Sequence, residues 1–136
     1  MSQQSSSSQE EMKPIDWGKI LHEDKMTLDL LDAALKPGRK LREMDKNVIN
    51  SFIEDLAMID EKVKAFDFHN NLQLANQASL ISSNIQDAIM EFILALDLLD
   101  TEHKLEPKDI EFIRRRFYAC LGNGQKYIQE ALQQFP

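Results

Sequence analysis

Residues that could hold a metal ion are sparse in this chain. The histidines are His22, His69 and His103, and the single cysteine is Cys120. A carboxylate and an imidazole stand three residues apart in Asp100-Thr101-Glu102-His103. Di-metal helical bundles place such a pair on each of two helices and add glutamates from the others, because two ions need ligands from several directions. The pair occurs here once, at an expected helix end where a histidine also favours the helix dipole, so we expect no metal site and no cofactor.

Catalytic constellations are also missing from the sequence. Cys120 would need a nearby base and a setting that stabilises its thiolate, which Arg114-Arg115-Arg116 could help to provide. A lone cysteine on an apolar helical stripe is more often a small core residue, and we interpret Cys120 in that way. The glycines do not have the spacing of a phosphate-binding loop: Gly18, Gly38, Gly122 and Gly124. We therefore expect no catalytic residues.

The charge balance favours some partners over others. The 136 residues include 23 acidic and 16 basic side chains, a formal net charge of -7, which repels nucleic acid and anionic lipid. We expect neither as a partner. A basic protein surface could be attracted, but an acidic balance is also common in soluble proteins, and we take that as the main interpretation. Arg114, Arg115 and Arg116 form the strongest local basic run. The run is either a solvated helix face paired with acidic neighbours or a candidate patch for an anion or an acidic partner.

The termini and the cysteine content bear on domains and location. Residues 1–13 are rich in serine and glutamine and have little to bury, so we expect a disordered tail followed by a single helical-bundle domain over residues 14–136. The start lacks the basic and apolar segments of a signal peptide, and one cysteine cannot form an intrachain disulfide. These features predict a cytoplasmic protein.

Apolar residues at three- and four-residue steps predict two helices in the first half. Residues 15–35 form either one kinked helix or two short ones, and Lys36-Pro37-Gly38 ends the pattern. The second helix, over residues 41–66, has the clearest apolar stripe. After it, Asn70 and Gln73 have the spacing of a capping box, which predicts a new helix start.

The third helix, over residues 72–100, differs in its second half. From Ala88 to Leu99 it is apolar almost all round, because four large side chains stand outside its main stripe: Met90, Ile93, Leu94 and Leu98. A helix that is apolar on every side must be covered on every side. Either this segment lies at the centre of the fold, or these four residues are an interface with another chain. We take them as the candidate interface.

The fourth helix begins at Pro107, since proline suits the first helical position. Gly122-Asn123-Gly124 would normally indicate a turn, which would leave a fifth short helix after Gly124. The apolar rhythm nevertheless continues in phase from Cys120 through Gly124 to Ile128, as in one continuous helix with a close-packed glycine. Short connections favour antiparallel neighbours, so the expected fold is all-α, an antiparallel up-down bundle of about four helices.

Three functions remain open. The favoured one is a non-catalytic protein-interaction module, such as a regulator, adaptor, chaperone or immunity-type inhibitor, because the apolar surface is in excess and catalytic motifs are missing. An enzyme or a cofactor or metal carrier with a pocket between helices is the second. The third is a structural homo-oligomer, for which a dimer is the expected form. The partner is accordingly another protein or a second copy of this chain.

Overall fold

The chain folds into α-helices throughout the part that the structure describes. The structure is a computed structural model that describes residues 17–35, 46–65, 71–102, 104 and 106–135, with side chains from residue 22 onward. These ranges contain four helices: α2 (Trp17–Ala34), α3 (Lys46–Lys64), α4 (Leu72–Glu102) and α5 (Pro107–Gln134). The predicted all-α fold of about four helices is confirmed. The predicted tail at residues 1–13 and the Lys36-Pro37-Gly38 breaker lie outside the described ranges.

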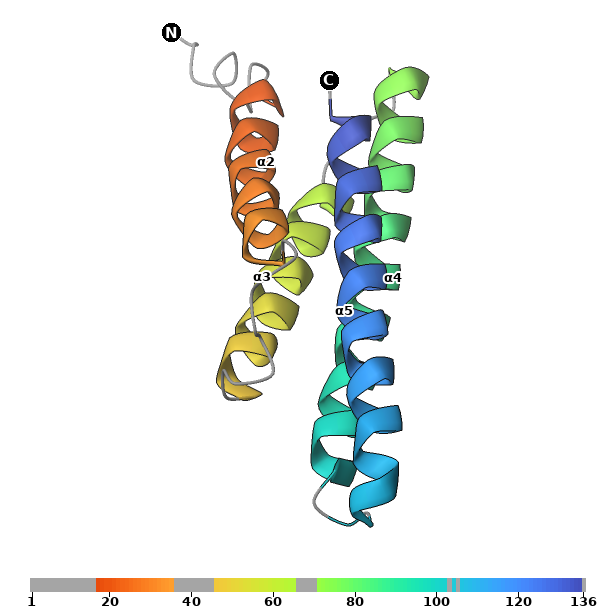
Figure 1. The fold of residues 1–136 in the computed structure, drawn as a ribbon. Coiled ribbons are helices and arrows are strands. Elements are labelled where there is room, and N and C mark those ends of the chain that lie inside the picture. Colours follow the sequence, from red (N-terminus) through yellow and green to blue (C-terminus); the bar gives the residue numbers. More distant parts are fainter. Residues whose placement is uncertain (1–16, 36–45, 66–70, 103, 105, 136) are drawn as a thin grey trace, which may run out of the picture.

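The four helices pack as an up-down bundle of unequal length. Figure 1 shows α4 and α5 side by side along their whole length, running in opposite directions, with the shorter α2 and α3 to one side. Each helix contacts the next one in the chain, and α2 also contacts α5. The first helix, which the sequence left as one or two pieces, is one helix from Trp17 to Ala34. An ion pair between Lys46 and Asp100 joins the start of α3 to the end of α4.

Local signals in the sequence account for two of the helix starts. The Asn71 side chain accepts a hydrogen bond from the backbone N–H of Leu74 at 3.0 Å, which satisfies one of the donors that a helix start leaves unpaired. Asn71, one residue after the expected Asn70, therefore caps α4, and Asn70 itself lies outside the described residues. The predicted start of the last helix at Pro107 is confirmed.

Helix α5 is continuous through its two glycines, so no separate short helix follows Gly124. Its 28 residues run unbroken from Pro107 to Gln134. Gly124 is buried against Phe92 of α4, and a Cβ atom added at position 124 would lie 2.6 Å from Cε1 of that ring. At Gly122 such an atom would meet nothing within 4 Å. The glycine at 124 therefore lets α5 approach the Phe92 ring closely, and the apolar rhythm predicted this helix better than the turn signal did.

A single apolar cluster joins all four helices. Its centre is Phe92, which is fully buried, with the Phe52 ring of α3 at a centroid distance of 5.7 Å on one side and Gly124 of α5 on another. Leu28 of α2 and Ile128 of α5 are also fully buried in the same cluster. Most of the apolar stripe of α4, which runs from Leu74 to Leu99, is buried against α3 and α5, and this turns the opposite face of α4 outward.

Candidate functional site

The four residues of the candidate interface gather on the outer face of α4. Met90 is 57% exposed, and Ile93 and Leu94 are each 46% exposed, whereas Leu98 is half-buried and packs against the core. Their spacing of three, one and four residues brings these side chains together on one side of the helix. We call Met90, Ile93, Leu94 and Leu98 the α4 apolar face.

This face is uncovered because the partners of α4 lie elsewhere around its circumference. Helices α3 and α5 make the main contacts of α4 and bury Ala88, Phe92 and Ala95 between them. The second half of α4 is therefore not enclosed by its own bundle within the described residues. Other large apolar side chains are exposed singly or in pairs, such as Met26 and Leu30 on α2. Across the described ranges, the α4 apolar face is the one place where three large apolar side chains are exposed within five consecutive residues.

A small hollow opens beside the α4 apolar face. It has a volume of about 90 Å³, and residues of both long helices line it: Leu94, Asp97, Leu98, Thr101, Arg116 and Cys120. Leu94 and Leu98 contribute apolar lining, and Asp97 and Arg116 contribute charged side chains. The hollow extends the surface of α4 onto α5, so a partner that covers the face would also contact α5.

The three arginines point in different directions. The Arg114 guanidinium pairs with Glu102 at the end of α4, with Nε 3.2 Å from Oε1, and Arg116 lines the hollow. Arg115 is exposed. Consecutive helical residues are separated by about 100° around the axis, so the run presents one guanidinium to each of three surroundings. An anion-binding or acidic-partner role for the run stays a prediction.

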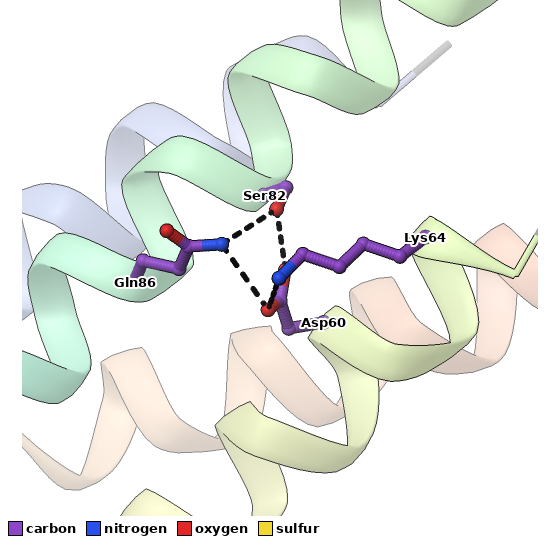
Figure 2. A network of polar contacts seen from close by, with 4 residues as sticks. All are labelled: Asp60, Lys64, Ser82 and Gln86. Atoms are coloured by element: carbon purple, nitrogen blue, oxygen red, sulfur yellow. Dashed lines mark hydrogen bonds and ion pairs between the residues drawn. The ribbon is translucent and has the colours of Figure 1, made fainter.

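A polar cluster that the sequence did not reveal joins α3 to α4. Figure 2 shows Asp60 and Lys64 of α3 facing Ser82 and Gln86 of α4. The Ser82 hydroxyl donates to one Asp60 carboxylate oxygen at 2.5 Å, and the Lys64 ammonium lies 3.0 Å from the other. The Gln86 amide donates to Asp60 at 3.4 Å and to the Ser82 oxygen at 3.2 Å. Both carboxylate oxygens of Asp60 thus have partners, although Asp60 is only 8% exposed to solvent.

This cluster lies beside an open groove of about 400 Å³. Small and polar residues of α3 and α4 line the groove: Val63, Lys64, Ala75, Ala78, Ser79, Ser82, Ser83 and Gln86. The charges of Asp60 and Lys64 are already engaged with each other. The Asp60–Lys64 pair lies within α3, so the contacts between the two helices are the hydrogen bonds that Ser82 and Gln86 donate to Asp60. A shift of one helix along the other would break these bonds and leave the buried carboxylate without its donors from α4. We therefore interpret the cluster as a structural determinant of the α3–α4 register.

The sequence contains one indication of this polar cluster, because two polar residues occupy positions within the apolar stripes of α3 and α4. Asp60 lies between Leu56 and Val63 at the four- and three-residue steps of the α3 stripe, and Ser82 stands likewise between Ala78 and Ile85 on α4. A carboxylate and a hydroxyl at such positions must find partners when the stripe is buried.

Asp24 of α2 follows the same rule with a less complete set of partners. It is 1% exposed, and the Lys62 ammonium of α3 lies 3.4 Å from its Oδ1 atom. Its Oδ2 atom is buried without a hydrogen-bond partner. Burial raises the pKa of the Asp24 carboxyl above its ordinary value, and the nearby Lys62 charge opposes that rise. The group contacts α3 through Lys62 and buries a carboxylate that is only partly satisfied.

The environment of Cys120 agrees with a core residue. The side chain is 6% exposed, and burial, together with the nearby Glu91 carboxylate, raises the pKa of the thiol, while Arg116 acts in the opposite direction. A thiol with a raised pKa is protonated at neutral pH and is a poor nucleophile. The arrangement is the opposite of an activated cysteine.

The described residues offer neither a metal centre nor a membrane span. Among them, no three His, Cys, Asp or Glu side chains converge as a metal ion would need, and His103 of the Asp100–His103 segment lies outside the description. None of the described helices combines the length and apolar character needed to cross a bilayer. Within the described residues, the fold is a four-helix bundle that leaves the α4 apolar face uncovered.

No protein-family model, curated protein or solved structure matches this chain.

Proposed function

We propose that this chain is a non-catalytic protein-interaction module that binds its partner through the α4 apolar face. The observation that carries the proposal is the exposure of Met90, Ile93 and Leu94, each about half open to solvent at the middle of a well-packed helix. Contiguous exposed apolar side chains commonly mark a binding surface, because leaving them in water forfeits the free energy of burial.

The position of the face supports a docking role. Directly behind it, Phe92 and Ala95 are fully buried, so the backbone that presents the face is held rigidly by α3 and α5. A rigid helix presents its side chains to a partner without a large loss of conformational entropy on binding. The polar cluster at Asp60 and Ser82, by contrast, is engaged in packing α3 against α4.

The test compares two leucines of similar exposure on the same helix. Leu94 is 46% exposed within the face, and Leu80 is 50% exposed outside it. Changing either one to glutamate adds the same charge to α4. We expect L94E to keep the helicity of the wild type and to lose a partner, identified by mass spectrometry after affinity capture from the native source, that wild type and L80E both retain.

Two outcomes would contradict the proposal. If L94E unfolds while L80E does not, Leu94 belongs to the core and the face is not a free surface. If L94E is folded and captures the same proteins as the wild type, the α4 apolar face does not bind them.

A further inference from the structure

The charges on α4 all have the same sign. Its 31 residues include no lysine, arginine or histidine, and the acidic side chains from its middle onward are Asp87, Glu91, Asp97, Asp100 and Glu102. Two of them already have partners of opposite charge, because Lys46 pairs with Asp100 and Arg114 with Glu102. Glu91 accepts a hydrogen bond from Asn123 at 3.3 Å.

Asp87 and Asp97 are the carboxylates left over beside the α4 apolar face. Both are exposed, and neither side chain has a hydrogen-bond or ion-pair partner in the described ranges. Asp87 lies one helical turn before Met90, and Asp97 lies between Leu94 and Leu98 in sequence. The cation beside the face is Arg116, at the hollow that Asp97 also lines. Counting Glu91, three carboxylates surround the face against one guanidinium, so a binding partner meets an acidic border.

The spacing of the face suits a helix. Residues 90, 93, 94 and 98 repeat at the three- and four-residue steps that form ridges on a helix, and such ridges pack into the grooves of another helix. The hollow between Leu94 and Arg116 is a hole that one apolar side chain of the second helix would fill. Recognition of an amphipathic helix by anchors at these steps is a common mode of protein binding.

A second copy of this chain fits the face poorly. Two α4 helices packed against each other would bring Asp87 and Asp97 of one copy near the same carboxylates of the other, and like charges across an interface disfavour pairing. The net charge of -7 opposes self-association at longer range.

We infer that the occupant of the α4 apolar face is a basic amphipathic helix of a partner protein, with apolar anchors against Met90, Ile93 and Leu94 and cationic side chains against Asp87 and Asp97. This inference rests on the proposed function and adds to it the chemistry of the partner.

The experiment titrates the full chain with two synthetic helical peptides. They share leucines at the same three- and four-residue steps, and they differ only in carrying lysine or glutamate at the flanking positions. We expect the lysine peptide to bind at least about tenfold more tightly than the glutamate peptide in isothermal titration calorimetry, because two flanking pairs form in one complex and are repulsive in the other.

Paired variants separate a local effect from one of overall charge. D87N/D97N should weaken the lysine peptide about threefold to tenfold, as expected for the loss of two exposed ion pairs. D29N/E54Q removes the same total charge from exposed positions on α2 and α3 and should leave the affinity within twofold of the wild type.

Several results would overturn the inference. These are equal binding of the two peptides, binding of neither, or an equal loss of affinity in D87N/D97N and D29N/E54Q. Light scattering that shows a dimer, separated into monomers by L94E, would also overturn it, while leaving the α4 apolar face as a binding surface. If instead L94E captures every partner of the wild type, the proposed function itself fails.

Discussion

Adding one methyl group to α5 tests the packing at the centre of the bundle. In G124A the new Cβ atom would lie 2.6 Å and 2.7 Å from two carbon atoms of the Phe92 ring, closer than such atoms approach in real proteins. Phe92 is fully buried, so its ring can move only by displacing its neighbours. Overpacking of this kind costs about 1–3 kcal/mol.

The neighbouring glycine provides the matched control. In G122A the added atom meets nothing within 4 Å, so the variant should gain about 1 kcal/mol from the higher helix propensity of alanine. G124A gains the same propensity and then loses the overpacking term. The free energy of unfolding should therefore be about 1–3 kcal/mol lower in G124A than in G122A, and G122A should exceed the wild type.

The assay is urea unfolding followed by circular dichroism at 222 nm. Equal slopes against urea would show that the variants differ in stability and not in the compactness of their end states. If G124A is as stable as G122A, the Phe92 ring does not lie against position 124, and the close approach of α4 and α5 described above is wrong.

Three further predictions concern the buried side chains of Ser82, Asp24 and Cys120. S82A removes the hydroxyl that donates to Asp60 and should lower the free energy of unfolding by about 1–3 kcal/mol. The control S83A, at an exposed position, should change it by less than about 0.5 kcal/mol. Equal effects of the two variants would refute the structural role of the cluster. Burial raises the pKa of Asp24, so the folded chain binds more protons than the unfolded chain between the ordinary value of 3.8 and the raised pKa. Its contribution to stability is full below 3.8 and is lost as the pH rises through the raised pKa. D24N should thus be more stable than the wild type at pH 7, and its stability in thermal unfolding should depend less on pH above 4. If D24N is less stable than the wild type at pH 7, the predicted direction of the pKa effect on stability is wrong. Cys120 should react slowly with a thiol reagent at neutral pH until denaturant is added, because it is buried and its pKa is raised; fast labelling of the folded chain would show that it is accessible.

The sequence predicted the helices well because each one buries a single stripe. Apolar residues at three- and four-residue steps placed all four helices, and Pro107 marked the start of the last one. Gly124 shows how two local rules can conflict. A glycine pair separated by asparagine favours a turn, but the burial of Cys120 and Ile128 on either side holds the helix continuous.

The polar groups of the core were missed for a physical reason. Asp60, Ser82 and Asp24 each occupy a stripe position, and whether such a residue is buried depends on which residue of another helix faces it. Ser82 follows Asp60 by 22 residues and Lys62 follows Asp24 by 38, so the pairs meet only when the helices pack. A periodicity along one helix does not contain this information.

The apolar excess of α4 led to the candidate interface, which stays a prediction, but the exposure of its residues could not be read from the sequence. The sequence could not say whether Met90 and Leu94 were internal or exposed, and the structure places them at the surface. Leu98 proved to be partly covered by the core. Which carboxylates beside the face are already paired also depends on the packing of the helices. Asp100 pairs with Lys46 of α3, and Asp97 lies beside the hollow.

The most direct test of the docking face is methyl NMR of the full chain, labelled at methionine, isoleucine and leucine, during titration with the lysine peptide. We predict that the largest chemical-shift changes occur at Met90, Ile93 and Leu94, while the equally exposed methyl groups of Met58 and Leu80 stay near their free positions. Changes centred on Met58 or Leu80, with the methyl groups of Met90, Ile93 and Leu94 unmoved, would contradict the assignment of the α4 apolar face as the binding surface.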